Sequence, residues 1–261
     1  MLSERYNFTE TVLDYIAEQD VTEQIDFYIQ HKSRAKVYFL NAHCANVAVS
    51  NTAYQRALHQ ADLVLPDGVG VLWAAKTLEL PHRQNLNGTD LIPRLAHELI
   101  AKHGHLNIFI LGGRPGVAEA AAEKLEAAHP GLRVSGTQHG YFKKEENASI
   151  IAEINRLEPD FVLVGMGVPL QELWIEQNAH LLNTGAVFAV GGLIDFLSGR
   201  IPRAPLPIRK AKLEWAWRFA MEPSRMFTRY IIGNPRFISH VLAAHRSGSS
   251  KVVQEKVAIL D

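Results

Sequence analysis

Between residues 35 and 190, short apolar runs alternate with longer amphipathic segments, and this alternation most limits the possible folds. Runs rich in β-branched and aromatic residues lie at 37–40, 63–65, 107–111, 133–135, 161–165 and 187–190. Segments with helical periodicity lie at 46–59, 69–79, 89–103, 115–128, 145–156 and 170–182. Strands joined by helical crossovers form parallel sheets covered by helices on both faces. We therefore predict an α/β fold with a Rossmann-like, mostly parallel sheet.

The character of the chain changes after Gly199. The proline-rich run IPRAPLPIRK is followed by a helical pattern in KLEWAWRFAMEPSRMFTRYIIGNPRF. Residues 200–236 hold nine Lys or Arg and two acidic residues, a net charge of +7 within a chain of net charge zero. We predict an α/β core over 1–199, a basic helical appendage over 200–246 and a loose tail over 247–261.

Targeting signals and cysteine content favour a cytoplasmic protein. Cys44 is the single cysteine, so no intramolecular disulfide can form. The N-terminus lacks the basic and apolar regions of a signal peptide. No segment approaches the roughly 20 uninterrupted apolar residues that span a bilayer, because Asp195 and Arg200 interrupt the best candidate. Any membrane contact is expected to be peripheral, on the inner face of the plasma membrane.

Asp67 is the first candidate for chemistry. It follows an apolar run and precedes Gly68 and Gly70 in ADLVLPDGVGVLW. Ligands of parallel sheets bind beyond the carboxyl ends of the strands, so a carboxylate here lies where a substrate would be. A role in a turn or as a helix cap is the better explanation of a lone Asp-Gly pair. The functional interpretation therefore needs other polar residues at the same edge.

Such residues occur in GVPLQELW, where Gly165 and Gly167 end a predicted strand and Pro169 can begin a helix. Gln171 falls in the first turn of this helix and can hydrogen-bond a sugar hydroxyl or a phosphate. The alternative is that Gln171 is solvated and Glu172 only complements the helix dipole. Spacing alone does not separate the two.

Two glycine pairs open further helices. Gly112 and Gly113 in ILGGRPGVAE, and Gly191 and Gly192 in FAVGGLIDF, can expose backbone amides to a diphosphate or a ribose. Asp195 follows the second pair by one helical turn and can accept hydrogen bonds from ribose or sugar hydroxyls. Tight packing of strand against helix is an equal alternative for both pairs.

The segment NLNGTDLIPRL contributes polar residues before another helix. Asn85 and Asn87 face the loop, and Thr89 or Asp90 can cap the helix. We favour capping as the role of Asp90.

The sequence does not predict a metal site. Its twelve histidines form no H-E-x-x-H motif and no Cys/His cluster, and no Asp-x-Asp pair is present. Positive side chains would then have to balance the charge of a diphosphate. Arg218, Arg225 and Arg229 fall on one helical stripe and can do so. The same segment fits an ordinary amphipathic core helix, which it favours when taken alone, a nucleic-acid patch, or a helix lying on anionic lipid.

Seven motifs in this order resemble the WecG/TagA/CpsF family of bacterial glycosyltransferases (glycosyltransferase family 26), over roughly residues 35–236. They are LPDGVGVLWA, NGTDL, ILGGRPGVAE, HGYF, GMGVPLQELWI, GGLIDFLSGRIPRAP and LEWAWRFAMEPSR. The resemblance implies a UDP-sugar donor, a polyprenyl-diphosphate-sugar acceptor at the membrane surface, and no cofactor. Such enzymes build exopolysaccharide, teichoic acid linkage units and enterobacterial common antigen. No nucleic-acid partner is implied, and a homo-oligomer stays open.

The resemblance also implies roles for individual residues. Asp67 occupies the position of the proposed general base of an inverting transfer, and Gln171 that of a pocket residue beside it. Asn41 matches a family asparagine. The appendage arginines matched by Arg203, Arg218 and Arg225 are expected to close over the diphosphate.

Three departures bear on the sugar. Phe39 stands where relatives often carry Thr, Asn85 where they often carry Arg, and Leu170 where Lys is common. A hexose donor such as glucose is therefore open beside N-acetylmannosamine or its uronate. The rival functions are a non-catalytic nucleotide-sugar or lipid-binding regulator, and a Rossmann-type oxidoreductase, for which the first-strand fingerprint is missing.

Overall fold

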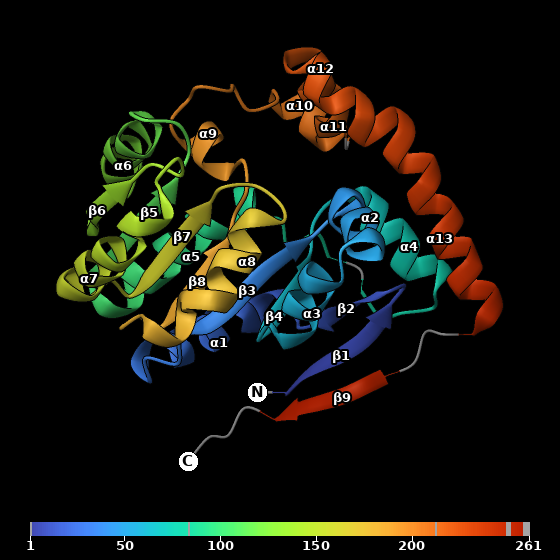
Figure 1. The fold of residues 1–261 in the computed structure, drawn as a ribbon, viewed down its shortest axis with the longest axis horizontal. Coiled ribbons are helices and arrows are strands. Elements are labelled where there is room, and N and C mark those ends of the chain that lie inside the picture. Colours follow the sequence, from blue (N-terminus) through green and yellow to red (C-terminus); the bar gives the residue numbers. More distant parts are fainter. Residues whose placement is uncertain (1, 83, 212, 249–251, 258–261) are drawn as a thin grey trace.

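The computed structural model describes all residues except 1, 83, 212, 249–251 and 258–261. Its centre is a parallel sheet of six strands in the order β4-β3-β8-β7-β5-β6. The strands are β3 Ala35–Leu40, β4 Leu63–Pro66, β5 Leu106–Gly112, β6 Leu132–Gln138, β7 Phe161–Gly165 and β8 Ala186–Ala189. All six predicted strands are present, and the predicted α/β class is confirmed (Figure 1).

Helices cover both faces of this sheet because side chains alternate along each strand. Val37 and Phe39 of β3 pack into one buried cluster, and Tyr38 and Leu40 pack into the other. One face is covered by α1 Glu18–Gln30, α5 Gly88–His103, α6 Val117–Ala128 and α9 Leu193–Leu197. The other is covered by α2 Ala42–Ser50, α3 Thr52–Gln60, α4 Val69–Thr77, α7 Asn147–Leu157 and α8 Leu170–Asn178.

Two predicted helices are divided in the structure. The helix expected over 46–59 is two helices, because Asn51 takes an extended conformation and caps α3 by accepting a hydrogen bond from the Tyr54 amide at 2.9 Å. The helix expected over 170–182 ends at Asn178 and continues as the short 3-10 turn η2, Ala179–Leu181. A second 3-10 turn, η1 Lys144–Glu146, leads into α7.

A second, antiparallel sheet was not predicted. It has the order β2-β1-β9, with β1 Leu2–Phe8, β2 Thr11–Tyr15 and β9 Val252–Val257. The prediction of a loose tail is therefore wrong for β9, since pairing with β1 supplies the backbone hydrogen bonds that its short sequence does not announce. Residues 249–251 and 258–261 of that tail lie outside the described residues.

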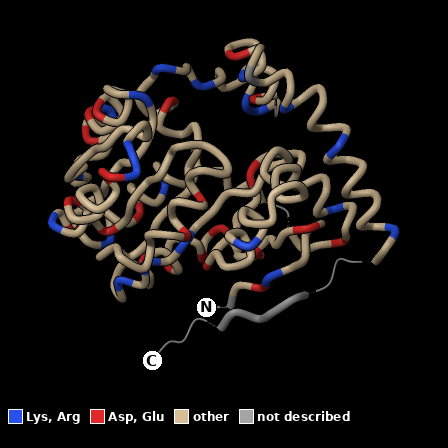
Figure 2. The backbone as a smooth tube through the Cα atoms, in the orientation of Figure 1, with Lys and Arg blue, Asp and Glu red and all other residues tan. Residues whose placement is uncertain are grey.

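The basic appendage is helical, as predicted. It contains α10 Leu206–Lys210, α11 Glu214–Met221, α12 Pro223–Phe227, the π-helical turn η3 Thr228–Ile232 and α13 Gly233–Ser247. Figure 1 shows these elements arching over one edge of the sheet, and Figure 2 shows Lys and Arg spread along them. None of the helices described has the length and apolarity needed to cross a bilayer.

The last helix, α13, fixes the appendage to the core. Phe237 and Val241 are buried in the same cluster as α2 and α4, and the Phe237 ring stacks on Phe8 with centroids 6.2 Å apart. The Asn46 side chain donates a hydrogen bond to the Gly233 carbonyl at 2.7 Å.

Candidate active site

A cavity of about 720 Å³ lies between the sheet edge and the appendage. Its floor comes from segments that follow β3, β4, β7 and β8, and its roof comes from α11, η3 and α13. The carboxyl ends of neighbouring parallel strands meet at one edge of a sheet, which brings these distant segments together. The cavity is therefore the place where a ligand of this fold is expected.

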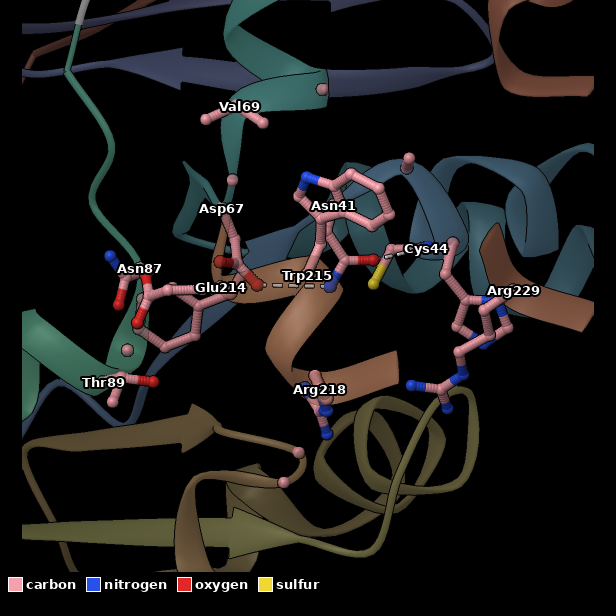
Figure 3. A pocket seen from close by; sticks show the side chains of 18 of the residues that line it. Asn41, Cys44, Asp67, Val69, Asn87, Thr89, Glu214, Trp215, Arg218 and Arg229 are labelled. Carbon is pink, nitrogen blue, oxygen red and sulfur yellow. Dashed lines mark hydrogen bonds between the residues drawn. The ribbon is translucent and has the colours of Figure 1, made fainter. Parts of the chain in front are cut away.

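Asp67 lies at the end of β4 and lines this cavity (Figure 3). The Asn41 side chain caps α2 by accepting a hydrogen bond from the Cys44 amide at 3.1 Å, which turns its Nδ2 toward Asp67 Oδ2, also at 3.1 Å. Burial raises the pKa of Asp67 above its usual range, although the Asn41 hydrogen bond and the charge of Arg218 act in the opposite direction. A carboxylate with a raised pKa, held in a fixed orientation, is suited to accept a proton.

The turn after Asp67 is shaped by Gly68 and Asn85. Gly68 has a φ of 94°, a conformation that side chains other than glycine rarely adopt. Its amide donates a hydrogen bond to Asn85 Oδ1 at 2.7 Å. Asn85 therefore holds the loop that presents the carboxylate, besides lining the cavity.

The helix cap predicted at Asp90 or Thr89 is in fact Asn87. Its side-chain oxygen accepts from the Asp90 amide at 3.0 Å, and its Nδ2 donates to Asp90 Oδ2 at 2.9 Å. The sequence prediction was wrong because α5 begins at Gly88, earlier than its apolar pattern indicates. Asn87 lines the cavity, whereas Asp90 is not among the lining residues and is paired with Arg203.

Gln171 joins two loops of the cavity floor. Its Oε1 accepts hydrogen bonds from the Gly167 amide at 3.2 Å and the Gly191 amide at 2.9 Å, and its Nε2 donates to Glu172 Oε1 at 2.8 Å. Both side chains are buried. The solvated alternative is therefore wrong, and Gln171 fixes the loops after β7 and β8 relative to each other.

Glu172 is a buried acid that the sequence did not assign to the site. Burial raises its pKa to about 7, against the opposing effect of the hydrogen bond from Gln171. Its position in the first turn of α8 suggested only a helix-dipole role. Burial of a polar residue in a helix of mixed pattern leaves no clear signal in one sequence.

The two glycine pairs differ in position. Gly191 and Gly192 line the cavity, and the Arg218 guanidinium lies so close to Gly192 that a Cβ there would be 2.6 Å from it. Gly112 and Gly113 are not among the lining residues. A Cβ on Gly112 would be 2.4 Å from the Gly165 carbonyl oxygen, so this glycine permits close packing of β5 and β7.

Asp195 also stands outside the set of lining residues. Its Oδ1 accepts a hydrogen bond from Arg200 Nε at 2.7 Å. The carboxylate expected to meet a ribose is thus engaged by the first arginine of the appendage.

Three appendage arginines line the cavity: Arg203, Arg218 and Arg229. Arg203 pairs with Asp90 and faces Glu214 Oε1 at 3.7 Å, and Arg218 lies over the Phe196 ring, 5.3 Å from its centroid. Arg225 belongs to α12, but its side chain lies outside the described residues. Guanidinium groups gathered opposite a carboxylate suit a reaction in which a diphosphate leaves.

Apolar lining residues were not assigned to the site from the sequence. They include Trp73, Phe196, Trp215, Tyr230 and Ile238. Trp73 was the most accessible to prediction, since it follows Val69 by four residues on the helix that begins directly after Asp67.

In the described part of the chain, no group of three or more His, Cys, Asp or Glu side chains is arranged to hold a metal ion. The polar groups of the cavity are instead one carboxylate, several amides and the arginines.

Comparison with known proteins identifies relatives along most of the chain. The WecG/TagA/CpsF glycosyl transferase family matches residues 6–251. An N-acetylglucosaminyldiphosphoundecaprenol N-acetyl-beta-D-mannosaminyltransferase of Bacillus spizizenii is 28% identical over 222 residues, covering 85% of this chain and 84% of the relative. The enzyme of the same name from Staphylococcus aureus strain MW2 is 29% identical over 208 residues, covering 79% of this chain and 80% of the relative. With a family match that includes both the core and the appendage, the chain belongs to the WecG/TagA/CpsF family of glycosyl transferases.

Proposed function

We propose that this glycosyltransferase moves a hexose, an N-acetylhexosamine or its uronate from a UDP-sugar to a polyprenyl-diphosphate-linked sugar, with inversion at the anomeric carbon. The product would be an intermediate of a cell-surface polysaccharide. The observation that carries the proposal is the carboxyl group of Asp67, oriented by Asn41 and facing the appendage arginines across one cavity. The relatives from Bacillus spizizenii and Staphylococcus aureus support the acceptor class, since their names specify a diphosphoundecaprenol-linked sugar.

The reaction is a single displacement. Asp67 accepts the proton of the acceptor hydroxyl while its oxygen forms a bond to the anomeric carbon of the donor, and the bond from that carbon to the diphosphate oxygen breaks. The raised pKa of Asp67 makes the carboxylate a stronger base than an exposed aspartate. Gln171 would keep the floor loops in place and need not touch the sugar.

Arg203 and Arg218 would neutralise the charge that develops on the departing UDP. Bidentate guanidinium contacts to phosphate are strong in a site with little water, and they allow the transfer to proceed without a metal ion. Arg218 is already placed against Gly192, where the backbone also approaches the cavity. Phe39, in place of the family's common threonine, gives the floor an apolar residue and leaves the donor sugar open.

The appendage would hold the enzyme on the inner face of the cytoplasmic membrane. Its exposed apolar side chains include Leu206, Leu213, Phe227, Ile231 and Ile232, in a region rich in Lys and Arg. Removal of the whole appendage would also disrupt α13 and β9, so point variants are the better test. Ile231→Ser with Ile232→Ser should weaken binding to anionic vesicles; unchanged binding would contradict this part of the proposal.

The test of function is UDP release from UDP-glucose, UDP-N-acetylglucosamine, UDP-N-acetylmannosamine and its uronate, each with polyprenyl-diphosphate-linked sugars and with or without EDTA. We expect release that requires acceptor, resists EDTA and falls about 10²–10⁴-fold in Asp67→Asn, the usual contribution of a general base. Unchanged turnover in Asp67→Asn would refute its role. Tight donor binding with no turnover by any pair would favour the non-catalytic regulator.

A further inference from the structure

We propose that the part of the cavity between α4 and α13 binds the acceptor's diphosphate and the first isoprenoid units of its lipid. Arg229 would contact the diphosphate, and Val69, Trp73 and Ile238 would contact the isoprenoid chain. This inference rests on the proposed function and assigns one region of the same cavity to one part of one substrate.

The walls of this region are apolar and open to solvent. Val69 and Trp73 lie one helical turn apart on α4, and Ile238 lies on α13; all three line the cavity. Trp73 and Ile238 are each 42% exposed. Large apolar side chains that stay exposed beside a catalytic cavity are suited to an apolar ligand.

The apolar region is continuous with the proposed base. Val69 follows Asp67 by two residues, so the end of β4 supplies the carboxylate and the start of α4 supplies the wall. Between them the helix packs closely: a Cβ on Gly70 would be 3.8 Å from Ala42 Cβ and 3.9 Å from Phe237 Cε1. The buried Phe237 ring thus closes the floor between α4 and α13.

Two arginines reach the cavity at different places. Arg218 lies against Gly192 and Phe196, at the loops after β8. Arg229 comes from η3, the turn that leads into α13, and Figure 3 shows its side chain apart from that of Arg218. Tyr230 feels both charges: burial raises its pKa, while Arg218 and Arg229 lower it and Asp67 raises it. The cavity can therefore hold two diphosphates, one at each arginine.

The order of groups in the acceptor matches this arrangement. A lipid-linked sugar consists of a sugar hydroxyl, a diphosphate and an isoprenoid chain, in that order. Asp67, Arg229 and the apolar walls offer a base, a cation and a hydrophobic surface around one cavity. The donor's diphosphate would then be bound at Arg218, on the side of Gly191 and Gly192.

The test compares two acceptors with the same N-acetylglucosaminyl diphosphate and different tails, a geranyl group of two isoprene units and a methyl group. The donor is the one that gives UDP release in the panel above. The wild type should prefer the geranyl acceptor in kcat/KM by about tenfold or more, since burial of even a few methylene groups has an effect of that size. Equal values would overturn the inference and leave the proposed function standing, whereas no transfer to either acceptor would count against the proposed function.

Variants locate the binding region. Trp73→Ala and Ile238→Ala should each reduce the geranyl preference by about threefold or more, while activity with the methyl acceptor is kept as the internal control of folding. Leu181→Ala is the matched control, because Leu181 is 49% exposed on η2 and is not among the lining residues. A preference that survives in both cavity variants would contradict the inference.

Arg229→Gln tests the diphosphate contact. It should raise the KM of both acceptors by about tenfold and leave the donor KM unchanged, since a charge-assisted hydrogen bond is lost only on the acceptor side. Arg218→Gln should instead impair the donor side. A rise of the donor KM in Arg229→Gln, with the acceptor KM unchanged, would reverse the assignment and overturn it.

Discussion

The α/β core and the appendage use similar side chains in opposite ways. In the core, apolar residues fill two clusters on either side of the sheet and are almost fully buried. In the appendage, the described apolar residues of α10, α11 and η3 stay largely exposed, and burial is concentrated at Phe237 and Val241 of α13. Apolar content alone therefore does not identify a core.

Charged groups follow the same division. The core contains an ion pair between Arg5 and Asp14 in which both side chains are buried. The pair of Asp90 with Arg203, which links core and appendage, is partly exposed. Buried partners are costly to remove, whereas exposed pairs contribute little. Changes in the core should therefore lower stability, and changes at the appendage should alter activity with little effect on stability.

The largest effect on stability is expected for Asp14→Ala. Asp14 accepts two hydrogen bonds from Arg5, at 2.7 and 2.5 Å, and one from the Val64 amide at 2.7 Å, so it joins the small sheet to β4. Loss of one partner of a buried pair costs about 3–5 kcal/mol, measured as the free energy of unfolding in urea. Glu18→Ala, which removes an exposed pair with Arg94, is the control and should cost less than about 1 kcal/mol. Equal losses would remove the distinction between buried and exposed pairs.

The second prediction concerns Glu172 and pH. Its pKa of about 7 in the folded protein lies above the ordinary value of 4.5, so the folded state binds more protons between these values. Stability should then fall as the pH rises from about 5 to 7.5, by on the order of 2 kcal/mol, and change no further above that range. Glu172→Gln keeps an acceptor for Gln171 and lacks the titration. The difference between the two unfolding curves isolates Glu172, and parallel curves would contradict the prediction.

The third prediction moves to the appendage, where Arg218→Lys should lower kcat by about tenfold or more with little change in the thermal midpoint. Lysine keeps the charge but loses the planar contact with Phe196 and the bidentate geometry toward phosphate. Arg236→Lys, at an exposed position of α13, serves as the matched control. A large fall in stability without a fall in kcat would place Arg218 with the core instead.

The sequence predicted what depends on local pattern. All six strands of the parallel sheet were found because buried parallel strands read as continuous apolar runs. The small sheet was missed because β1 and β9 are far apart in the chain and lie in segments of mixed polarity, so only tertiary pairing defines them.

Prediction of the cavity residues followed the same rule. Asp67, Gln171 and the Gly191–Gly192 pair follow strands, and strand ends meet at one edge, so their proximity could be expected. The partners of Asp90, Asp195 and Gln171 could not, since each depends on side-chain geometry across loops. The split of α2 from α3 likewise turns on the single capping side chain of Asn51.

The smallest expected effect is that of Asp90→Asn. Burial alone would raise the pKa of Asp90, but hydrogen bonds from Arg203 and Asn87 outweigh it and keep the pKa below its ordinary value, so the group is ionised in any neutral assay. Because the pair with Arg203 is exposed, its loss should cost at most about 1 kcal/mol of stability.

Asp90→Asn should nevertheless lower the donor KM by about two- to threefold, because the donor diphosphate no longer competes with Asp90 for Arg203. Arg203→Gln should raise the same KM, and added salt should reduce the difference between wild type and Asp90→Asn, since salt screens the exposed pair. An unchanged donor KM in Asp90→Asn would mean that Arg203 does not exchange between the two anions. The core and the appendage would then be coupled through the packing of α13 and not through this ion pair.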